Sequence, residues 1–175
     1  SVAGIMQPGN DGNVTCNAAT SKYVEWSSSN SNIATVTGNG NAATIKAISG
    51  GTATITAAIP ADGLQYSFNV TVGVTIAEDT VEVGQGQSVA LTTNSNSVSD
   101  VYWWSADENV ATVSNGVVYG VYAGSTTVYA SCLDHNPNNN AGDSVTVKVP
   151  YVVNTPETTV LVGDKIAIST TANPS

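Results

Sequence analysis

Residues 26–36 read WSSSNSNIATV, and residues 104–113 read WSADENVATV, which is the same pattern with one residue deleted. Further along the chain, GTATITA at residues 51–57 matches GSTTVYA at residues 124–130. Self-similarity at a period of roughly 75 residues indicates a tandem array in which each copy is one small domain, too large for a single turn of a solenoid.

Alternation of apolar and polar residues around these stretches predicts strands. Residues 66–72 read YSFNVTV and place Tyr66, Phe68, Val70 and Val72 on one face, and SVTVKV at residues 144–149 repeats the pattern. Helical periodicity is absent almost everywhere. Clusters of Gly, Asn and Ser, such as TGNGN and SNG, separate the strands and predict tight hairpin turns. The sequence therefore predicts an all-β fold of small sandwiches.

The repeat also predicts the domain boundaries. Two largely complete modules cover residues 1–73, with an abbreviated start, and residues 74–149. A third start is visible, because VLVGDKIAI at residues 160–168 echoes VEVGQGQSVAL at residues 81–91. We therefore interpret residues 150–175 as the first strands of a third, incomplete module.

The joints between modules, VGV and VPY, are short, which favours a semi-rigid rod. Two explanations for the incomplete module stay open. The sequence is a segment of a longer polypeptide, or its C-terminal strands complete a partial module in the next subunit by strand addition.

The ordered series of motifs resembles the bacterial immunoglobulin-like domain, group 2 (Big2). The family pattern runs from V-G-x-x-x-x-L through W-S-S-x-x-x-x-A-T-V to A-G-x-A-T-I-T-A and a final alternating strand. The second module matches from Val81 to Val149, and the first matches from Trp26 onward. The resemblance implies tandem immunoglobulin-like sandwiches that serve as extracellular or virion-associated stalks, adhesin segments or carbohydrate-facing decorations.

Composition excludes several function classes. Thirteen acidic residues stand against four Lys and Arg, giving a formal net charge of −9. Nucleic acid and anionic membranes are therefore unsuited as partners, because both require clustered cations. No run of 18 apolar residues is present, so no membrane insertion is expected. The first residues lack the features of a signal peptide, which fits either its removal or a chain that begins inside a longer protein.

The tryptophans are the principal candidate site residues. With one residue deleted, Trp26 and Trp104 are equivalent and are expected to fill the space between the two sheets. Strand alternation then points Trp103 outward, beside Val101. There it is covered by a loop or a neighbouring module, or it contacts a ligand. The expected structural core is made up of Trp26, Trp104, Val36, Val113, Ile55 and Val128.

The two cysteines and the single histidine offer less specific chemistry. Cys16 and Cys132 fall in different modules, so both are expected to be buried free thiols, with a bond to another chain as the alternative. Asp134, His135 and Asn136 belong to a polar loop that we interpret as a solvated hairpin connection. A weak Ca²⁺ site is the alternative, and no cofactor is expected.

No nucleophile–base pair, phosphate-binding loop or catalytic carboxylate pair occurs in a convincing context, so the chain is not expected to be an enzyme. The sequence predicts a non-catalytic spacer at a bacterial cell surface or on a phage virion, with neighbouring modules or subunits as partners. The alternative is a module that binds carbohydrate or a receptor through Trp103 and residues 134–142. Such a module could also be accessory to an enzyme elsewhere in a longer polypeptide.

Overall fold

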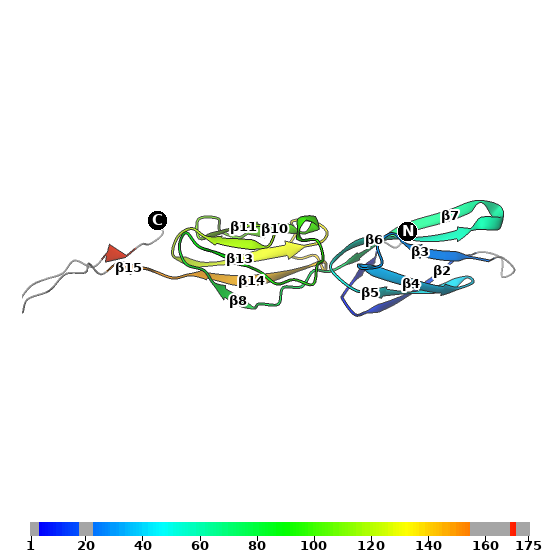
Figure 1. Ribbon diagram of the computed structural model, residues 1–175, viewed down its shortest axis with the longest axis horizontal. Helices are drawn as coiled ribbons and strands as arrows, with labels where there is room; N and C mark the ends of the chain where they lie inside the picture. Colours follow the sequence, from blue (N-terminus) through cyan, green and yellow to red (C-terminus); the bar gives the residue numbers. More distant parts are fainter. Residues whose placement is uncertain (1–3, 18–22, 155–168, 171–175) are drawn as a thin grey trace, which may run out of the picture. The chain divides into compact units, whose positions relative to one another are not determined.

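A computed structural model of the chain describes residues 4–17, 23–154 and 169–170. The regular elements of these residues are strands, apart from two short 3₁₀ helices, η1 (Pro60–Asp62) and η2 (Val98–Asp100) (Figure 1). The prediction of an all-β fold built from immunoglobulin-like sandwiches is confirmed.

The first repeat folds into a four-stranded and a three-stranded sheet. The four-stranded sheet has the order β1 (Gly4–Met6), β7 (Leu64–Val72), β6 (Gly51–Ile59) and β3 (Glu25–Ser28). The three-stranded sheet has the order β2 (Asp11–Thr15), β5 (Ala42–Ala47) and β4 (Ala34–Asn39). All neighbouring strands run antiparallel except β1 and β7, which are parallel.

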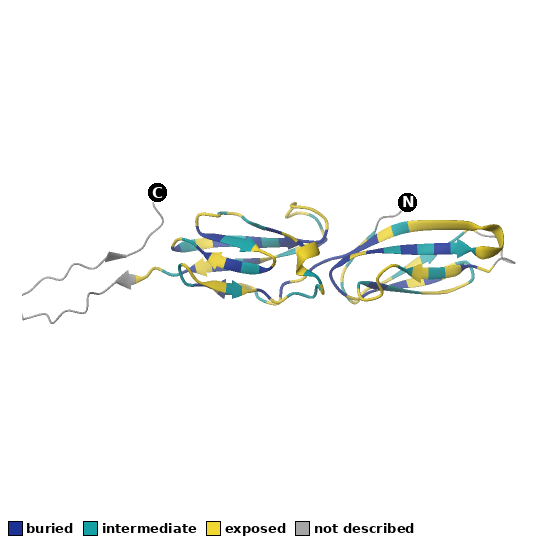
Figure 2. Cartoon of the chain, turned by 45° about the horizontal axis from the view of Figure 1, so that its top comes forward, coloured by how far each residue is buried: buried dark blue, intermediate teal, exposed yellow. Residues whose placement is uncertain are grey.

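The core of this repeat lies between the two sheets. Ala34, Ile45 and Ala47 face it from the three-stranded sheet and its end, and Ile55 and Val72 face it from the other. Strand β5 alternates between exposed and buried residues, and β6 alternates between buried residues and residues that are exposed or half-buried (Figure 2). This alternation follows from the period-two geometry of a strand with one solvated face.

The second repeat has the same arrangement. Its four-stranded sheet has the order β10 (Tyr102–Ser105), β13 (Gly124–Ser131), β14 (Gly142–Val149) and β8 (Thr80–Glu82). Its three-stranded sheet has the order β11 (Ala111–Ser114), β12 (Val117–Gly120) and β9 (Ser88–Ala90). Strands β8 and β14 are parallel, as β1 and β7 are in the first repeat.

The hairpin between β11 and β12 shows how the local sequence sets the register. Ser114 pairs with Val117 across a two-residue loop of Asn115 and Gly116. Both loop residues have positive φ, 48° and 76°. A type I′ turn requires this conformation, and Asn-Gly adopts it at low cost. The turn predicted at this point of the sequence is confirmed.

Of the third repeat, the structure describes β15 (Val153–Asn154) paired with β16 (Ser169–Thr170). The motif predicted at residues 160–168 lies outside the described residues. The boundaries at 73/74 and 149/150 stay predictions.

Packing divides the chain into two compact units that cut across the sequence repeats. Unit 1 consists of Ser1–Ala77, Thr93–Tyr102 and Ala130–Asp143, and unit 2 of Glu78–Thr92, Trp103–Tyr129 and Ser144–Ser175. Two segments of the second repeat, a loop with η2 and the β13–β14 connection, thus pack with the residues of the first repeat.

Candidate functional site

The two adjacent tryptophans have the opposite orientation to the one predicted. Trp103 is buried, with 9% of its surface exposed, whereas Trp104 is half-buried. The indole of Trp104 stacks on Tyr129 with ring centroids 5.2 Å apart and an interplanar angle of 14°. The expectation that Trp104 fills the core and Trp103 points outward is therefore corrected.

The error comes from the deletion assumed in the alignment of the repeats. The N–H of Ser29 donates to the Thr54 carbonyl, and the N–H of Ala106 donates to the Thr127 carbonyl, both at 2.9 Å. Ser29 follows Trp26 by three residues, and Ala106 follows Trp103 by three. Trp26 and Trp103 are thus equivalent without any deletion. A shift of one residue moves every side chain of a strand to the other face.

Both equivalent tryptophans pack over a glycine of the facing hairpin. A Cβ on Gly38 would lie 2.2 Å from Cδ1 of Trp26, and a Cβ on Gly116 would lie 3.3 Å from Cζ2 of Trp103. The indole N–H of Trp26 donates to the Gly40 carbonyl at 3.0 Å. Trp26 itself is half-buried and packs against the core of the first repeat.

The other predicted core residues lie as follows. Ile55 and Val128 are fully buried, with 0% exposed. Val36 and Val113 are half-buried, and Val36 packs against the core cluster of the first repeat.

The candidate loop residues Asp134, His135 and Asn136 are exposed and lie in the β13–β14 connection. One carboxylate oxygen of Asp134 accepts hydrogen bonds from the N–H of Asn136 at 3.0 Å and from Nδ2 of Asn139 at 2.6 Å. Among the residues that the structure describes, no three His, Cys, Asp or Glu side chains cluster in a way that could hold a metal ion.

The aromatic partner of this loop is Tyr102 rather than Trp103. The rings of Tyr102 and His135 meet edge to face with centroids 5.0 Å apart, and Tyr102 is 45% exposed. Sequence reasoning missed Tyr102 because the assumed deletion assigned the outward position to its neighbour. With the ungapped alignment, the alternation of β10 alone would have pointed to Tyr102.

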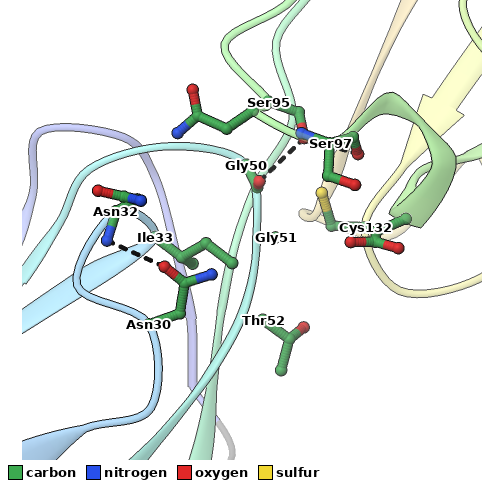
Figure 3. Close-up of a pocket in the computed structure, with 11 residues that line it drawn as sticks. Asn30, Asn32, Ile33, Gly50, Gly51, Thr52, Ser95, Ser97 and Cys132 are labelled. Atoms are coloured by element: carbon green, nitrogen blue, oxygen red, sulfur yellow. Dashed lines mark hydrogen bonds between the residues drawn. The ribbon is translucent and has the colours of Figure 1, made fainter.

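A cavity of about 400 Å³ lies in unit 1 beside the Cys132 thiol (Figure 3). Its wall includes Ile33 and Gly51, and the Ser95 hydroxyl, which donates to the Gly50 carbonyl at 3.1 Å. Cys132 is buried and Cys16 is half-buried, and both are free thiols. Burial raises the pKa of the Cys132 thiol to about 11, because the thiolate is poorly solvated there.

We expect Cys132 to react with iodoacetamide far more slowly than Cys16 in the folded chain. The thiolate is the reacting species, and at pH 8 a thiol whose pKa is about 11 is ionised in roughly one molecule in a thousand. The reaction of Cys132 should speed up as the pH rises toward 11, and it should match that of Cys16 in denaturant. Mass-spectrometric alkylation kinetics check this. Equal rates for the two thiols in the folded chain would contradict the assigned burial.

The segment between β7 and β8, residues 73–79, is here called the connector. The N–H groups of its first four residues, 73–76, each donate a hydrogen bond to an acceptor outside the connector. Gly73 donates to the Met6 carbonyl at 2.9 Å, Val74 to the Ala141 carbonyl at 3.2 Å, Thr75 to Asn94 Oδ1 at 2.8 Å and Ile76 to Asp143 Oδ2 at 2.8 Å. Val74 and Ile76 are buried. The connector is therefore folded backbone rather than a solvated linker.

The chain is a tandem immunoglobulin-like β-sandwich protein. This class is defined by the paired sheets, by the parallel first and last strands of each repeat, and by a tryptophan that packs over a glycine of the facing hairpin. The family model of the bacterial Ig-like domain (group 2) matches residues 10–62 and 70–136. The chain belongs to this family.

The chain is similar to a curated relative and to several solved structures. An uncharacterized protein of Clostridium acetobutylicum is 34% identical over 133 residues, which are 69% of this chain and 13% of that protein. The chain thus spans a small part of its curated relative. The surface layer protein SbsC (domains 1–6) is 21% identical, with a TM-score of 0.33 over 75% of this chain and 21% of that chain. A C-terminal fragment of intimin, solved with the intimin-binding domain of its translocated receptor, is 16% identical to the chain and has a TM-score of 0.38. The match covers 82% of this chain and 59% of that fragment.

Proposed function

We propose that the chain is a non-catalytic spacing segment of a larger surface-exposed protein, such as a stalk or adhesin at a bacterial cell surface. Its family and the small share of its curated relative that it spans support this role. In the part of the chain that the structure describes, no helix is long and apolar enough to cross a membrane.

The observation that carries the proposal is the parallel pairing of first and last strands in both repeats. Gly4 to Met6 pair with Val70 to Val72, and Thr80 to Glu82 pair with Thr146 to Lys148. Tension applied at the two ends of a repeat pulls such strands in opposite directions along their axes. All hydrogen bonds of the pair are then loaded together, rather than one at a time as in peeling. This arrangement suits a segment that transmits tension.

Val83→Pro is expected to halve, roughly, the force at which the second repeat unfolds in single-molecule pulling of the whole chain. The N–H of Val83 donates to the Lys148 carbonyl at 3.0 Å, at the end of the parallel pair, and proline has no N–H. Val83→Ala is the matched control, because it removes the same buried methyl groups and keeps the N–H. Equal unfolding forces for the two variants would contradict the claim that the parallel pair resists tension.

The alternative is a module that binds carbohydrate or a receptor at one end of the second repeat. The exposed pair of Tyr102 and His135 favours it, because an aromatic ring beside polar loop residues suits sugar contacts. A glycan-array screen of the chain separates the two functions, since a pure spacer shows no specific binding.

A further inference from the structure

A contact inside unit 1 joins the connection between β5 and β6 to the segment that follows β9. The Ser95 hydroxyl donates to the Gly50 carbonyl at 3.1 Å, and Nδ2 of Asn96 donates to the Ser49 hydroxyl at 3.0 Å. Asn94 lies beside them and takes part through its side chain. We call this contact, residues 49–50 against residues 94–96, the latch.

Gly50 allows the two sides of the latch to approach each other closely. A Cβ on Gly50 would lie 3.1 Å from Cα of Val74 and 3.1 Å from Oδ1 of Asn94, which is closer than an ordinary van der Waals contact. The same Asn94 side chain accepts from the N–H of Thr75 and donates to the Gly73 carbonyl. The latch therefore closes over the connector, and a side chain at position 50 would push its two sides apart.

The second repeat has a different residue at the position of Gly50. Strand β6 begins at Gly51 and follows Gly50, whereas β13 begins at Gly124 and follows Ala123. The φ of Gly50 lies outside the left-handed region, so its backbone conformation is open to alanine. The glycine is thus explained by the close approach of the connector and Asn94 rather than by the local backbone.

The latch is loosely packed along one side. The cavity of about 400 Å³ described above has Ile33 and Gly51 on one wall and Ser97 and Cys132 on the other (Figure 3). The two side-chain bonds of the latch are isolated and neutral, and each such bond contributes little net stability. The first repeat, in contrast, is held by the ladder between β6 and β7 and by an apolar core. Opening of the latch should therefore cost less free energy than unfolding of a sandwich.

We propose that the latch is an extension joint that opens reversibly under tension before either sandwich unfolds. When residues 49–50 separate from residues 94–96, the cavity opens and solvent reaches the Cys132 thiol, which is 8% exposed in the closed state. No strand has to leave its sheet, because both sides of the latch lie between strands. The chain then lengthens while its sandwiches stay folded. This inference rests on the role in transmitting tension that is proposed above.

Gly50→Ala tests the latch in the unloaded chain, because the added methyl group wedges it open. We expect Cys132 to react with iodoacetamide at least about tenfold faster than in the parent chain, with an unchanged far-ultraviolet circular dichroism spectrum. The double variant Ser95→Ala, Asn96→Ala removes both side-chain donors and should act in the same direction. Gly4→Ala is the matched control, because a Cβ on Gly4 would meet nothing within 4 Å. Parent rates in both latch variants would overturn the proposal.

Single-molecule pulling of the whole chain tests the response to tension. We expect a reversible extension step at a force below that at which either sandwich unfolds. Gly50→Ala should remove this step or shift it to lower force, and Gly4→Ala should leave it unchanged. The absence of any step before the first sandwich unfolds would overturn the proposal. If Val83→Pro still lowers the unfolding force of the second repeat in that case, the spacing function stands and the latch alone is wrong.

Discussion

Trp103→Ala is expected to lower the free energy of unfolding by about 3–5 kcal/mol, whereas Trp104→Ala lowers it by about 1 kcal/mol. Trp103 is 9% exposed and packs against Gly116 in the hairpin of β11 and β12, so its removal leaves a large cavity. Trp104 is half-buried and loses mainly its stacking contact with Tyr129. The expected losses of stability differ because adjacent residues of a strand point to opposite faces of the sheet.

Urea unfolding followed by far-ultraviolet circular dichroism measures both variants. Because the chain has two compact units, the transition that includes unit 2 is the one to compare. Each variant retains two tryptophans, Trp26 in unit 1 and the other member of the adjacent pair in unit 2, so fluorescence gives a second probe of both units. A larger loss of stability in Trp104→Ala than in Trp103→Ala would restore the orientation predicted from the gapped alignment.

The sequence alone was sufficient for the fold class, the family and the hairpin at residues 114–116. These depend on local signals, namely alternation, turn residues and an ordered series of motifs that occurs twice. The orientation of Trp103 depended on a single alignment gap. Because side chains alternate along a strand, an alignment error of one residue assigns each side chain to the wrong face of the sheet, even when the motif itself is correctly identified.

The connector was read from the sequence only as a short joint. Its fold depends on side chains far along the chain, since Asn94 and Asp143 accept the hydrogen bonds of Thr75 and Ile76. No local pattern marks these acceptors.

The contact between Tyr102 and His135 was also predicted only in part from the sequence. The loop at residues 134–142 was identified as a candidate binding surface, but the ring beside it was assigned to Trp103. Once the repeats are aligned without a gap, β10 places Trp103 in the core and Tyr102 on the exposed face. The candidate surface then consists of Tyr102, Asp134, His135 and Asn136.

The spacer role depends on the claim that the connector is folded. Hydrogen exchange of the amides of residues 73–76 in the intact chain tests it most directly. Each of these N–H groups has a hydrogen-bond acceptor, and Val74 and Ile76 are buried. We expect exchange slowed by roughly a hundredfold or more relative to an unstructured peptide.

Asn94→Ala removes the acceptor of the Thr75 N–H and the donor to the Gly73 carbonyl, so it should speed exchange at Thr75 at least tenfold. Asn136→Ala is the matched control. The N–H and the side-chain oxygen of Asn136 bond to residues of its own exposed loop, so this variant should leave exchange in the connector unchanged. Slow exchange at residues 73–76 that is sensitive to Asn94 is the predicted result. Exchange at the rate of an unstructured peptide would contradict the account, because the connector would then be a flexible linker.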